Sequence, residues 1–484
     1  MIDFTNKLST TRFYDVDSDQ VNHGRKPALS QYESDRGRII NSAAVRRLQQ
    51  KTQVFPLERN SAVRSRLTHS LEVQQVGRFI VQTIFKKLGK DATANYGLQG
   101  LERHLESLVE MACLMHDIGN PPFGHFGEQA INDWFKKNLD SSLPTTDGKP
   151  LLLSGALVRD LCGFEGNAQG IRLVHSLLNL NLTFTQIAGI LKYTRCGTEP
   201  KPEANYLQKK VGFYFSEAAF VGQLCQHLQM GAGCRHPVSY IMEAADDISY
   251  CIADLEDAVE KGILDLDKLI AAFTEEFQSL CAEYRLSMDW PEAYQLPSKL
   301  VKAQNKAQRF DAIGTGQFFI DFRLMVLHPL VDYAAERFIE HIDAVYHGQF
   351  NQALLEDSSY AHAVAQSLKN VAFKYAFCDK EVEARELQGY RVIAGLLDIY
   401  QPLLSKSRQQ FDRIMTQHKD APLLEKRLFK KLSGKHIHAY NKAVVGQDDA
   451  TEFYYRCRLL QDYISGMTDQ FAYDEYRALM VSDK

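Results

Sequence analysis

The sequence predicts an almost all-α protein with little or no β-strand. Apolar residues recur three or four positions apart through most of the chain, most clearly at 71–80 and 105–113, which is the spacing of one face of a helix. Alternating strand patterns are few, and the best of them, the short stretch of Val211, Phe213 and Phe215, is weak.

The predicted helices are separated by only a few clear breaks. Ser, Pro and Gly residues at 140–150 and at 196–202 predict two exposed loops. The glycines at 231–233 interrupt the chain just before a helix that we expect to begin near Pro237. After about residue 290 the helical spacing continues, with few motifs that carry chemistry.

No linker divides the chain, although the usual domain size, roughly 100–200 residues, would suggest about two to four domains for 484 residues. We expect one core over 1–290 and a helical C-terminal region over 291–484 packed on it. Hydrophobic residues at 45% and charged residues at 24% are ordinary for a globular protein, so the core can bury a few polar catalytic groups.

The composition excludes several classes of protein. A net charge of −4 gives no global basic field, so contact with a nucleic acid would need a local basic patch. The nine cysteines include no C-x-x-C pair, which argues against a disulfide framework and a cysteine-rich zinc site. The N-terminus shows no secretory signal, and no run reaches the roughly 18 apolar residues of a membrane span. We therefore expect a cytoplasmic protein without a membrane partner.

An adjacent histidine and aspartate, His116 and Asp117, end one apolar helix and are followed by a glycine and two prolines. Such a pair offers an imidazole nitrogen and a carboxylate oxygen to one cation, although a lone His-Asp pair is more often a cap and a turn. Upstream, His69 lies on a predicted helix with Arg66 three residues before it, so the two share a face. A nitrogen ligand beside an arginine suits a metal next to a phosphate, because the guanidinium grips phosphate oxygens.

Downstream, Asp246, Tyr250 and Asp254 are spaced four residues apart and therefore line one side of a predicted helix. A carboxylate among the apolar residues around them needs a cation or a hydrogen-bond partner, and a solvated acidic face is the alternative. Mixed nitrogen and oxygen ligands suit manganese, iron or another borderline metal, and magnesium less well. The predicted metal ligands are His69, His116, Asp117 and Asp246.

The order His, His-Asp, Asp is the signature of the HD superfamily of phosphohydrolases, and the motifs between about 30 and 260 resemble bacterial dGTP triphosphohydrolases. Each motif is weak alone, but as a set they are very specific. The stretches that carry the resemblance are QVFPL at 53–57, RLTH at 66–69, HDIGNPPFGH at 116–125, FEGN at 164–167 and EAADDISY at 243–250. The resemblance implies an HD-domain helical bundle as the catalytic core over 1–290, with additional helices after it.

This resemblance implies hydrolysis of dGTP at the α-phosphorus, which releases deoxyguanosine and intact triphosphate with the help of a divalent metal ion, Mn²⁺ or Mg²⁺. It also implies that His125 and Glu128 are the catalytic pair. If a helix starts after the two prolines, Glu128 can orient the imidazole of His125 and raise its basicity. The alternative is a histidine at the start of a helix, followed by an acid that the helix dipole favours.

A triphosphate needs several cations, and Arg66, Lys192 and Lys210 are the candidates, although a solvated surface role is equally open for each lysine. The resemblance implies that Asn167 contacts a phosphate. It also implies that Tyr250 packs under the deoxyribose and leaves no room for a 2′-hydroxyl, whereas the 3′-hydroxyl is bound by two polar side chains, Gln53 and Asp254. The predicted substrate contacts are Gln53, Val54, Arg66, Asn167, Lys192, Tyr193, Lys210, Tyr250 and Asp254.

The segment 424–440 is locally basic with interleaved aromatic residues. It could bind single-stranded nucleic acid through phosphate contacts and stacking, and a solvated helix face is the alternative. Some members of the resembling family bind single-stranded DNA as an activator and form hexamers or tetramers, so the resemblance implies a homo-oligomer, with a hexamer favoured. The stretch ELQGYRVI at 386–393 also resembles the family, but its chemistry assigns it no role. The remaining histidines, such as His175, His328 and His341, are expected to be structural.

Three other functions are open. A dNTP triphosphohydrolase of broader specificity would share the same site, because guanine preference depends on base contacts that the sequence does not locate. An HD phosphodiesterase is disfavoured, because the chain lacks an obvious sensor domain and carries the catalytic pair and the sugar-binding set. A nucleic-acid-binding regulator with a vestigial HD site is the alternative from another class, but a binding module has no need for four metal ligands.

Overall fold

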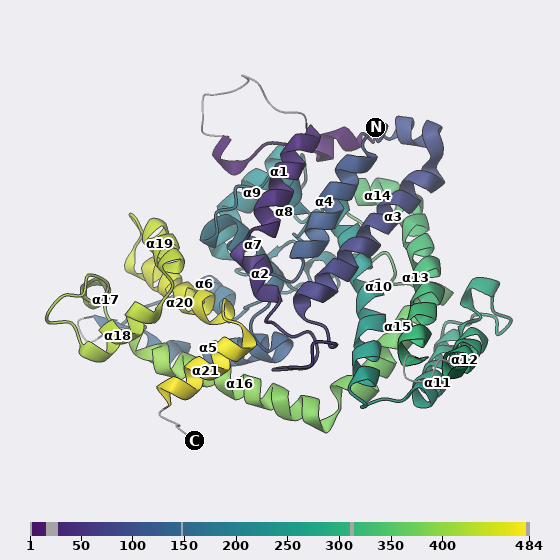
Figure 1. The fold of residues 1–484 in the computed structure, drawn as a ribbon. Helices are drawn as coiled ribbons and strands as arrows, with labels where there is room; N and C mark the ends of the chain where they lie inside the picture. Colours follow the sequence, from purple (N-terminus) through teal and green to yellow (C-terminus); the bar gives the residue numbers. More distant parts are fainter. Residues whose placement is uncertain (1, 16–27, 147–148, 310–313, 481–484) are drawn as a thin grey trace.

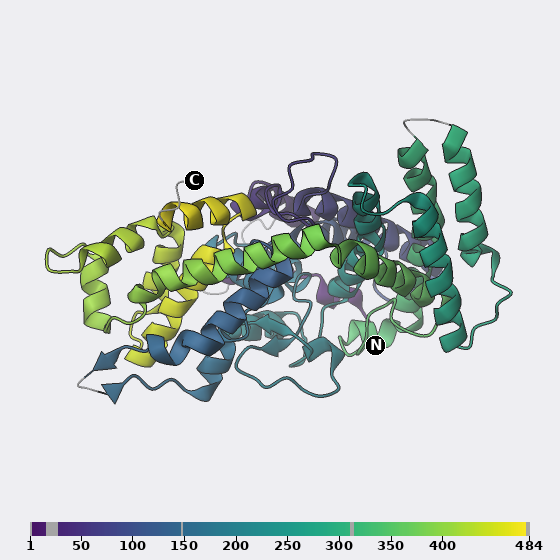
Figure 2. The same cartoon turned by 90° about the horizontal axis from the view of Figure 1, so that it is seen from below.

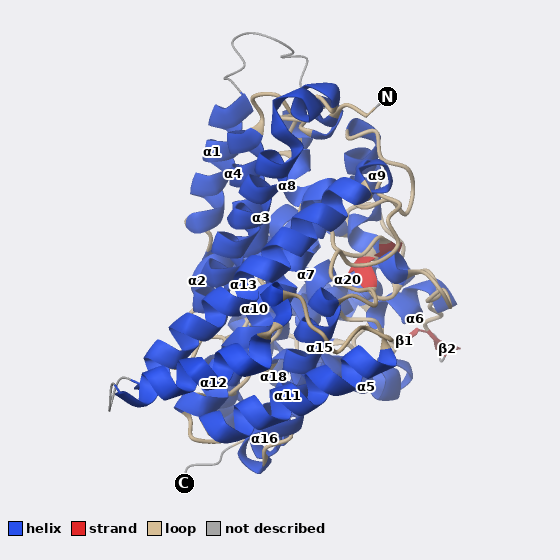
Figure 3. Cartoon of the chain, turned by 90° about the vertical axis from the view of Figure 1, so that its right-hand side faces the viewer, coloured by secondary structure: helices blue, strands red, loops and turns tan. Residues whose placement is uncertain are grey.

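The computed structural model describes residues 2–15, 28–146, 149–309 and 314–480. Helices make up nearly all of its secondary structure, which confirms the prediction of an all-α protein (Figure 3). The helices of the first half are α1 (Ala28–Ile40), α2 (Ala43–Leu48), α3 (Arg66–Asn95), α4 (Glu102–Met115), α5 (Gly124–Ser142), α6 (Gly155–Leu161), α7 (Gly166–Arg172), α8 (Phe184–Ala188), α9 (Ala218–His227) and α10 (Pro237–Glu260).

The second half of the chain continues in helices up to Leu479. These are α11 (Leu266–Glu283), α12 (Leu296–Ala307), α13 (Gly314–Glu340), α14 (Ile342–Tyr346), α15 (Tyr360–Ala372), α16 (Lys380–Tyr400), α17 (Arg408–Met415), α18 (Leu423–Lys431), α19 (Gly434–Ala443), α20 (Asp449–Ser465) and α21 (Asp469–Leu479). One π-helical turn, Leu173–Leu177, follows α7, and another, Phe373–Phe377, lies between α15 and α16.

The four strands among the described residues are only two or three residues long. β1 (Thr145–Thr146) pairs antiparallel with β2 (Lys149–Pro150), and β3 (Arg195–Cys196) pairs parallel with β4 (Val211–Phe213). The weak strand signal that begins at Val211 is therefore confirmed.

The predicted loop at 140–150 is wrong at its first three residues, because α5 continues to Ser142. The hydroxyls of Ser141 and Ser142 donate to the carbonyl of Asn138, so these serines are satisfied inside the last helical turn. By contrast, the break at 231–233 and the start of the next helix at Pro237 agree with the prediction.

The centre of the molecule is built from α3, α4, α10 and α13, which lie side by side in Figure 1. Helix α4 is buried along almost its whole length, from Leu105 to Met115. Gly77 lets α3 approach it closely, because a Cβ atom at this position would lie 2.6 Å from the sulfur of Cys113. The close contact of α3 with α4 brings the start of α3 next to the end of α4, where the HD motif, His116 and Asp117, lies.

Two hydrophobic cores stabilise the fold. The larger one contains side chains from α1 to α4 and from α8 to α15. The other contains side chains of α5 and α6 together with those of α16 to α21. Each core draws on both sides of residue 290, so the division into 1–290 and 291–484 stays a prediction.

Helix α16 joins the two cores. Figure 2 shows it running across the molecule alongside α5, and it also contacts α21 near the end of the chain. The C-terminal helices therefore pack directly against the segment that follows the HD motif. Among the described residues, none of the helices combines the length and the apolar character needed to cross a membrane.

Candidate active site

A cavity of about 920 Å³ opens where α3, α5 and α10 meet the C-terminal helices α15 and α16. All of the predicted site residues line it except His69 and Asp254. The sequence motifs that were far apart in the chain therefore converge on one cavity. Its volume is in the range of small-molecule sites.

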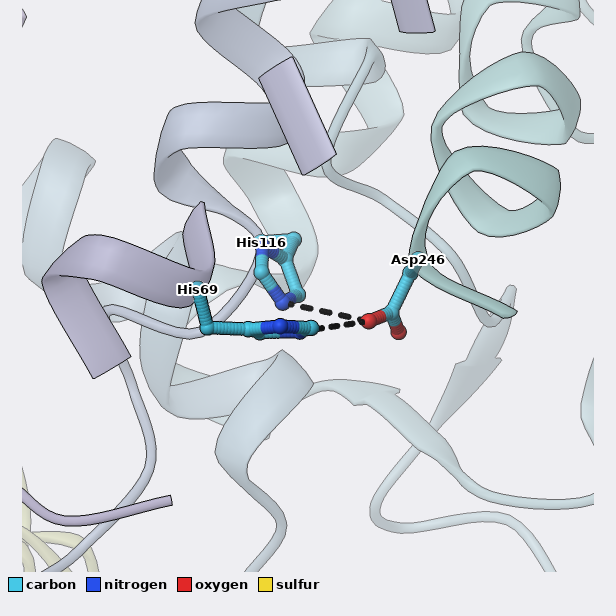
Figure 4. A group of neighbouring side chains, drawn as sticks. All are labelled: His69, His116 and Asp246. Carbon is cyan, nitrogen blue, oxygen red and sulfur yellow. Dashed lines mark hydrogen bonds and ion pairs between the residues drawn. The ribbon is translucent and has the colours of Figure 1, made fainter. Parts of the chain in front are cut away.

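Three side chains at one wall of this cavity form a compact group: His69 from α3, His116 at the end of α4, and Asp246 from α10 (Figure 4). Their ligand atoms all lie within 4.8 Å of one another. Oδ1 of Asp246 lies 3.3 Å from Nε2 of His69 and 3.4 Å from Nε2 of His116.

Local structure fixes the two imidazoles. Ser65 caps α3 in a capping box with Thr68, which holds the first turn that carries His69. His116 is the C-cap residue of α4, and its Nδ1 lies 2.7 Å from the carbonyl oxygen of Cys113. Because that carbonyl can only accept a hydrogen bond, Nδ1 carries the proton and Nε2 is left to coordinate a cation.

Asp117 lies beside this group but not within it. Its Oδ1 is 3.6 Å from Nε2 of His116, and it accepts a hydrogen bond of 2.7 Å from the amide of Asn120. Its Oδ2 accepts a hydrogen bond from the guanidinium of Arg66. Burial alone would raise the pKa of Asp117, but the charges of His116 and Arg66 hold it below its usual value.

The chemistry of these donors fits a metal ion. Two imidazole nitrogens and a carboxylate oxygen converge from three helices, and His69 is fully buried, so its imidazole was desolvated to reach this position. Although burial would raise the pKa of Asp246, His116 and His69 hold it far below its usual value, so its carboxylate is ionised. We regard the group as a candidate metal centre.

Lys192 lies next to the same carboxylate. Its ammonium group is 3.9 Å from Asp246 and 3.6 Å from Glu243, one turn earlier on α10. Glu243 is buried and also accepts hydrogen bonds from Arg235 at 2.6 Å and from Tyr206 at 2.8 Å. Burial opposes the ionisation of Glu243, but Arg235 and Lys192 lower its pKa to about 2. Lys192 is therefore a mostly buried cation that forms ion pairs with Glu243 and Asp246, not a solvated surface lysine.

A second pair stands on the opposite side of the HD motif, at the start of α5. Nδ1 of His125 lies 3.0 Å from Oε2 of Glu128, and the side chain of His125 is 83% exposed to the cavity and solvent. The other oxygen of Glu128 accepts a hydrogen bond of 2.8 Å from the backbone nitrogen of Gly166. The hydrogen bond to Glu128 raises the pKa of His125, although partial desolvation opposes it.

The FEGN motif supplies the neighbouring polar wall. Glu165 accepts hydrogen bonds from the amide of Asn167 at 2.8 Å and from the ammonium group of Lys210 at 3.1 Å. Burial and the nearby charge of Glu128 raise the pKa of Glu165. A cation and an amide are therefore tethered together at the edge of the cavity.

The predicted sugar-binding residues are brought together only in part. Tyr250 lines the cavity and stacks against Phe377, with ring centroids 6.2 Å apart. Gln53 and Val54 line it as well, and Oε1 of Gln53 is buried without a hydrogen-bond partner among the described residues. Asp254 is fully buried and does not line the cavity, and it lies about 12 Å along α10 from Asp246 at a rise of about 1.5 Å per residue. Burial raises its pKa to about 8.

The sequence missed one whole wall of the cavity. This wall consists of side chains from α15, the π-helical turn Phe373–Phe377 and α16, and its exposed side chains include two large apolar ones, Phe373 and Leu387. The residues concerned are Gln366, Lys369, Asn370, Phe373, Phe377, Cys378, Glu383, Glu386 and Leu387. The only signal for them was the stretch at 386–393, which begins with two of these residues.

The basic segment at 424–440 folds into α18 and α19. Arg427, Lys430 and Lys435 are exposed and can reach phosphates. Its aromatic residues Phe429 and Tyr440, however, are buried against Phe411, with ring centroids 5.8 and 5.6 Å from it. Of the two readings of this segment, stacking of these rings on bases is therefore wrong for this structure, because both rings are part of the second hydrophobic core.

The other histidines sit in structural environments. His175 stacks on Phe220 with ring centroids 3.7 Å apart, and burial lowers its pKa to about 4. His328 lies edge-on to Phe79, and His341 stacks on Phe350.

Comparison with known proteins agrees with this geometry. Residues 66–151 match the HD domain family, whose model covers His69, the HD motif and the His125–Glu128 pair. A probable deoxyguanosinetriphosphate triphosphohydrolase of Pseudomonas aeruginosa is 52% identical, over 99% of both chains. Deoxyguanosinetriphosphate triphosphohydrolases of Serratia proteamaculans and Salmonella typhimurium are 49% and 48% identical, over 100% of this chain and 99% of theirs.

Proposed function

The chain belongs to the deoxyguanosinetriphosphate triphosphohydrolase family, and on that premise we propose that it hydrolyses dGTP to deoxyguanosine and triphosphate. The single observation that carries the proposal is that one cavity is lined both by His116 and Asp246, which form a group with the buried His69, and by the His125–Glu128 pair. Similarity to the named relatives extends over the full length of both chains, so it includes every wall of that cavity.

The metal would be a divalent ion, Mn²⁺ or Mg²⁺, held by His69, His116, Asp117 and Asp246. When bound, such an ion supplies charge neutralisation at the phosphate and lowers the pKa of a water molecule. The mixed nitrogen and oxygen donors favour manganese over magnesium. Hydrogen bonds from Arg66 and Asn120 hold the carboxylate of Asp117, and its Oδ1 lies 3.6 Å from Nε2 of His116.

His125 would accept a proton from the attacking water, and Glu128 would keep the imidazole in the right tautomer. As the water oxygen bonds to the α-phosphorus, the bond from phosphorus to the 5′-oxygen of deoxyguanosine breaks, and that oxygen takes up a proton. Support comes from the orientation of the pair, because Nδ1 of His125 faces Glu128 and leaves Nε2 toward the cavity. The buried hydrogen bond from Gly166 fixes Glu128 in turn.

Arg66, Lys192 and Lys210 would neutralise the triphosphate, and Asn167 would add a neutral hydrogen bond. All four line the same cavity, and each of the three cations now faces a carboxylate that phosphate oxygens could replace. Tyr193 lines the cavity beside Lys192.

Tyr250 would pack under the deoxyribose and exclude a 2′-hydroxyl. Gln53 would bind the 3′-hydroxyl with the oxygen that has no partner among the described residues. Asp254 would support this contact from behind Tyr250 rather than from the cavity surface. Val54, which is buried next to Gln53, would contact the nucleoside.

The direct test is to incubate the purified chain with each dNTP and with GTP, in Mn²⁺ or Mg²⁺, and to resolve the products. Release of triphosphate and deoxyguanosine supports the proposed reaction, whereas pyrophosphate or orthophosphate contradicts it. Equal turnover of all four dNTPs would replace guanine preference with the broader specificity. Tight binding of single-stranded DNA without any turnover would favour a regulator with a vestigial site.

We also propose a homo-oligomer, with a hexamer favoured, and activation by single-stranded DNA. The exposed cations of α18 and α19 support DNA binding through phosphate contacts alone. Turnover measured with and without an oligonucleotide, at several salt concentrations, tests the activation. Light scattering of the purified chain tests the oligomeric state.

A further inference from the structure

One carboxylate near the C-terminus reaches both sides of the HD motif. Asp469, the first residue of α21, is 3% exposed. Its Oδ2 accepts hydrogen bonds from the backbone nitrogen of Thr52 at 3.0 Å and from the hydroxyl of the same residue at 2.6 Å. Its Oδ1 accepts a hydrogen bond of 3.1 Å from the backbone nitrogen of Phe123.

These two partners lead directly into the active-site cavity from different parts of the chain. Thr52 precedes Gln53, and Phe123 lies two residues before His125. Thr52, Gln53, Phe123 and His125 all line the cavity. About 70 residues of chain separate the two segments, so non-covalent contacts set the distance between them, and Asp469 supplies an acceptor that both share.

The turn at Phe123 needs support, because its backbone has a left-handed φ of 62°. The ring of Phe123 packs on Gly389 of α16 so closely that a Cβ atom at Gly389 would lie 2.4 Å from it. Thus α16 contacts the side chain of Phe123, and α21 binds its backbone nitrogen. Both contacts come from the C-terminal helices.

A buried lysine makes a parallel connection. The ammonium group of Lys51 donates to the carbonyl of Asn120, three residues after Asp117, and to the carbonyl of Ser465 at 3.0 Å, at the end of α20. Lys51 is 2% exposed. Adjacent residues, Lys51 and Thr52, therefore tie the same turn to the same end of the C-terminal helices.

Capping of its own helix does not explain Asp469. Thr468 is the N-cap residue of α21, and its hydroxyl accepts the hydrogen bond from the backbone nitrogen of Phe471. The carboxylate of Asp469 is left for the two distant backbone nitrogens.

We propose that Asp469 is a positioning residue for the hydrolysis of dGTP: it sets the separation between the wall that contains Gln53 and the turn that presents His125. This inference rests on the proposed function. A shift of the turn on the order of 1 Å would move the proton acceptor relative to the bound substrate, and such a misplacement costs about 100-fold in rate.

The test is Asp469→Asn, with Asp474→Asn as the matched control. The asparagine keeps the size of the side chain but has only one accepting oxygen, so one of the two segments loses its acceptor. Asp474 lies on the exposed side of the same helix and accepts a hydrogen bond only from Gln470 among the described residues. We expect Asp469→Asn to lower kcat for dGTP about 10- to 100-fold, and Asp474→Asn to leave it unchanged.

Two further measurements on Asp469→Asn distinguish a positioning role of Asp469 from a loss of folding. Metal content per folded chain should stay at the wild-type value. The acidic limb of the profile of kcat/KM against pH should move down by about half a pH unit, because a displaced turn loosens the hydrogen bond that raises the pKa of His125. A folded variant with wild-type kcat overturns the inference, and so does a lower kcat with an unmoved limb, because that pattern marks a merely structural residue.

If Asp469→Asn does not fold, Thr52→Val is the alternative variant that tests the same inference. It keeps the shape of the side chain and both backbone hydrogen bonds and removes only the hydroxyl donor. We expect a decrease in kcat of about five-fold, the value of one hydrogen bond, and an unchanged kcat overturns the inference. Wild-type turnover is measured in the same series, so absence of triphosphate release from the wild type would count against the proposed function and not against Asp469.

Discussion

Nδ1 of His125 lies 3.0 Å from Oε2 of Glu128, one turn along α5. The carboxylate can only accept a hydrogen bond, so Nδ1 carries the proton and Nε2 keeps its lone pair. Glu128 is 8% exposed and is fixed by Gly166, whereas the imidazole is open to the cavity. A buried acid thus sets both the tautomer and the basicity of an accessible base.

This pair predicts how the rate depends on pH. The ionised carboxylate of Glu128 stabilises the protonated imidazole and so raises the pKa of His125. A base acts in its neutral form, so kcat/KM should rise with pH through that pKa. Glu128→Gln removes the charge, which lowers the pKa and moves the acidic limb down by about one pH unit. The maximal kcat should fall about 10- to 100-fold, because a neutral partner no longer stabilises the imidazolium. Rates measured from pH 5 to 9 provide the check.

Asp140→Asn is the control for this experiment, because it removes an exposed acid from the far end of the same helix. Its profile should match that of the wild type. If the acidic limb of the kcat/KM profile of Glu128→Gln lies at the same pH as in the wild type, a group other than His125 titrates there.

Metal binding and proton transfer should separate by mutation. His116→Ala or Asp117→Ala should lose both bound metal and turnover, because each removes a donor or its neighbour from the group around Asp246. His125→Ala should keep the metal and lose about 10²- to 10⁴-fold in kcat. Metal content by elemental analysis, measured beside the rate, distinguishes the two classes. Retained turnover in His125→Ala would remove His125 from the mechanism.

Much of the site was predictable from the sequence because its residues lie in short motifs on regular helices. The spacing of Asp246 and Tyr250 placed both on one face of α10, and the helix that the pairing of His125 with Glu128 required after the two prolines begins at Gly124. Periodicity also indicated the apolar spacing at 71–80 and 105–113, which lies in α3 and α4. The fold class and the family followed from the same motifs.

The remainder depended on contacts between distant parts of the chain, which leave no local pattern. Phe373 and Glu386 line the cavity only because α15 and α16 pack beside α10 and α5. The aromatic residues of 424–440 suggested a stacking surface, but Phe429 faces the core. Asp254 has the right spacing and is nevertheless buried, because helical periodicity gives a direction and not a depth.

The sugar-binding wall predicts the basis of discrimination against ribonucleotides. Tyr250→Ala should open space beneath the sugar and raise kcat/KM for GTP relative to dGTP by about tenfold, since an apolar wall rejects an added hydroxyl only moderately. Tyr250→Phe keeps the ring that stacks on Phe377, so it should retain the preference for dGTP. Competition between the two nucleotides in one reaction measures the ratio directly. An unchanged ratio in Tyr250→Ala would assign the selection to another residue.

The second core predicts a large stability effect at a buried ion pair. Asp160 and Arg458 lie 2.6 Å apart, and both are fully buried. Asp160→Asn leaves the guanidinium without its counter-charge and should lower the free energy of unfolding by about 3–5 kcal/mol. Asp449→Asn breaks an exposed pair with Arg408 at 3.4 Å and should change it by less than about 1 kcal/mol. Urea unfolding of the three proteins makes the comparison, and similar values for the two variants would contradict it.

Lys192 provides a test of how the triphosphate is bound. Its ammonium group lies 3.9 Å from Asp246 and 3.6 Å from Glu243, so its removal leaves Glu243 paired with Arg235. Lys192→Gln should weaken competitive inhibition by inorganic triphosphate about tenfold or more, the value of one charge-assisted hydrogen bond, and leave inhibition by deoxyguanosine unchanged. The exposed Lys201→Gln is the matched control.

Metal content decides between the two roles open to Lys192. If Lys192 binds phosphate, the Lys192→Gln variant should keep its metal. If Lys192 mainly orients Asp246, the variant should lose metal as well. Weaker inhibition by triphosphate at full metal occupancy therefore supports phosphate binding. If the inhibition weakens only in proportion to lost metal, Lys192 acts through Asp246, and the charge of the substrate is met by Arg66 and Lys210 instead.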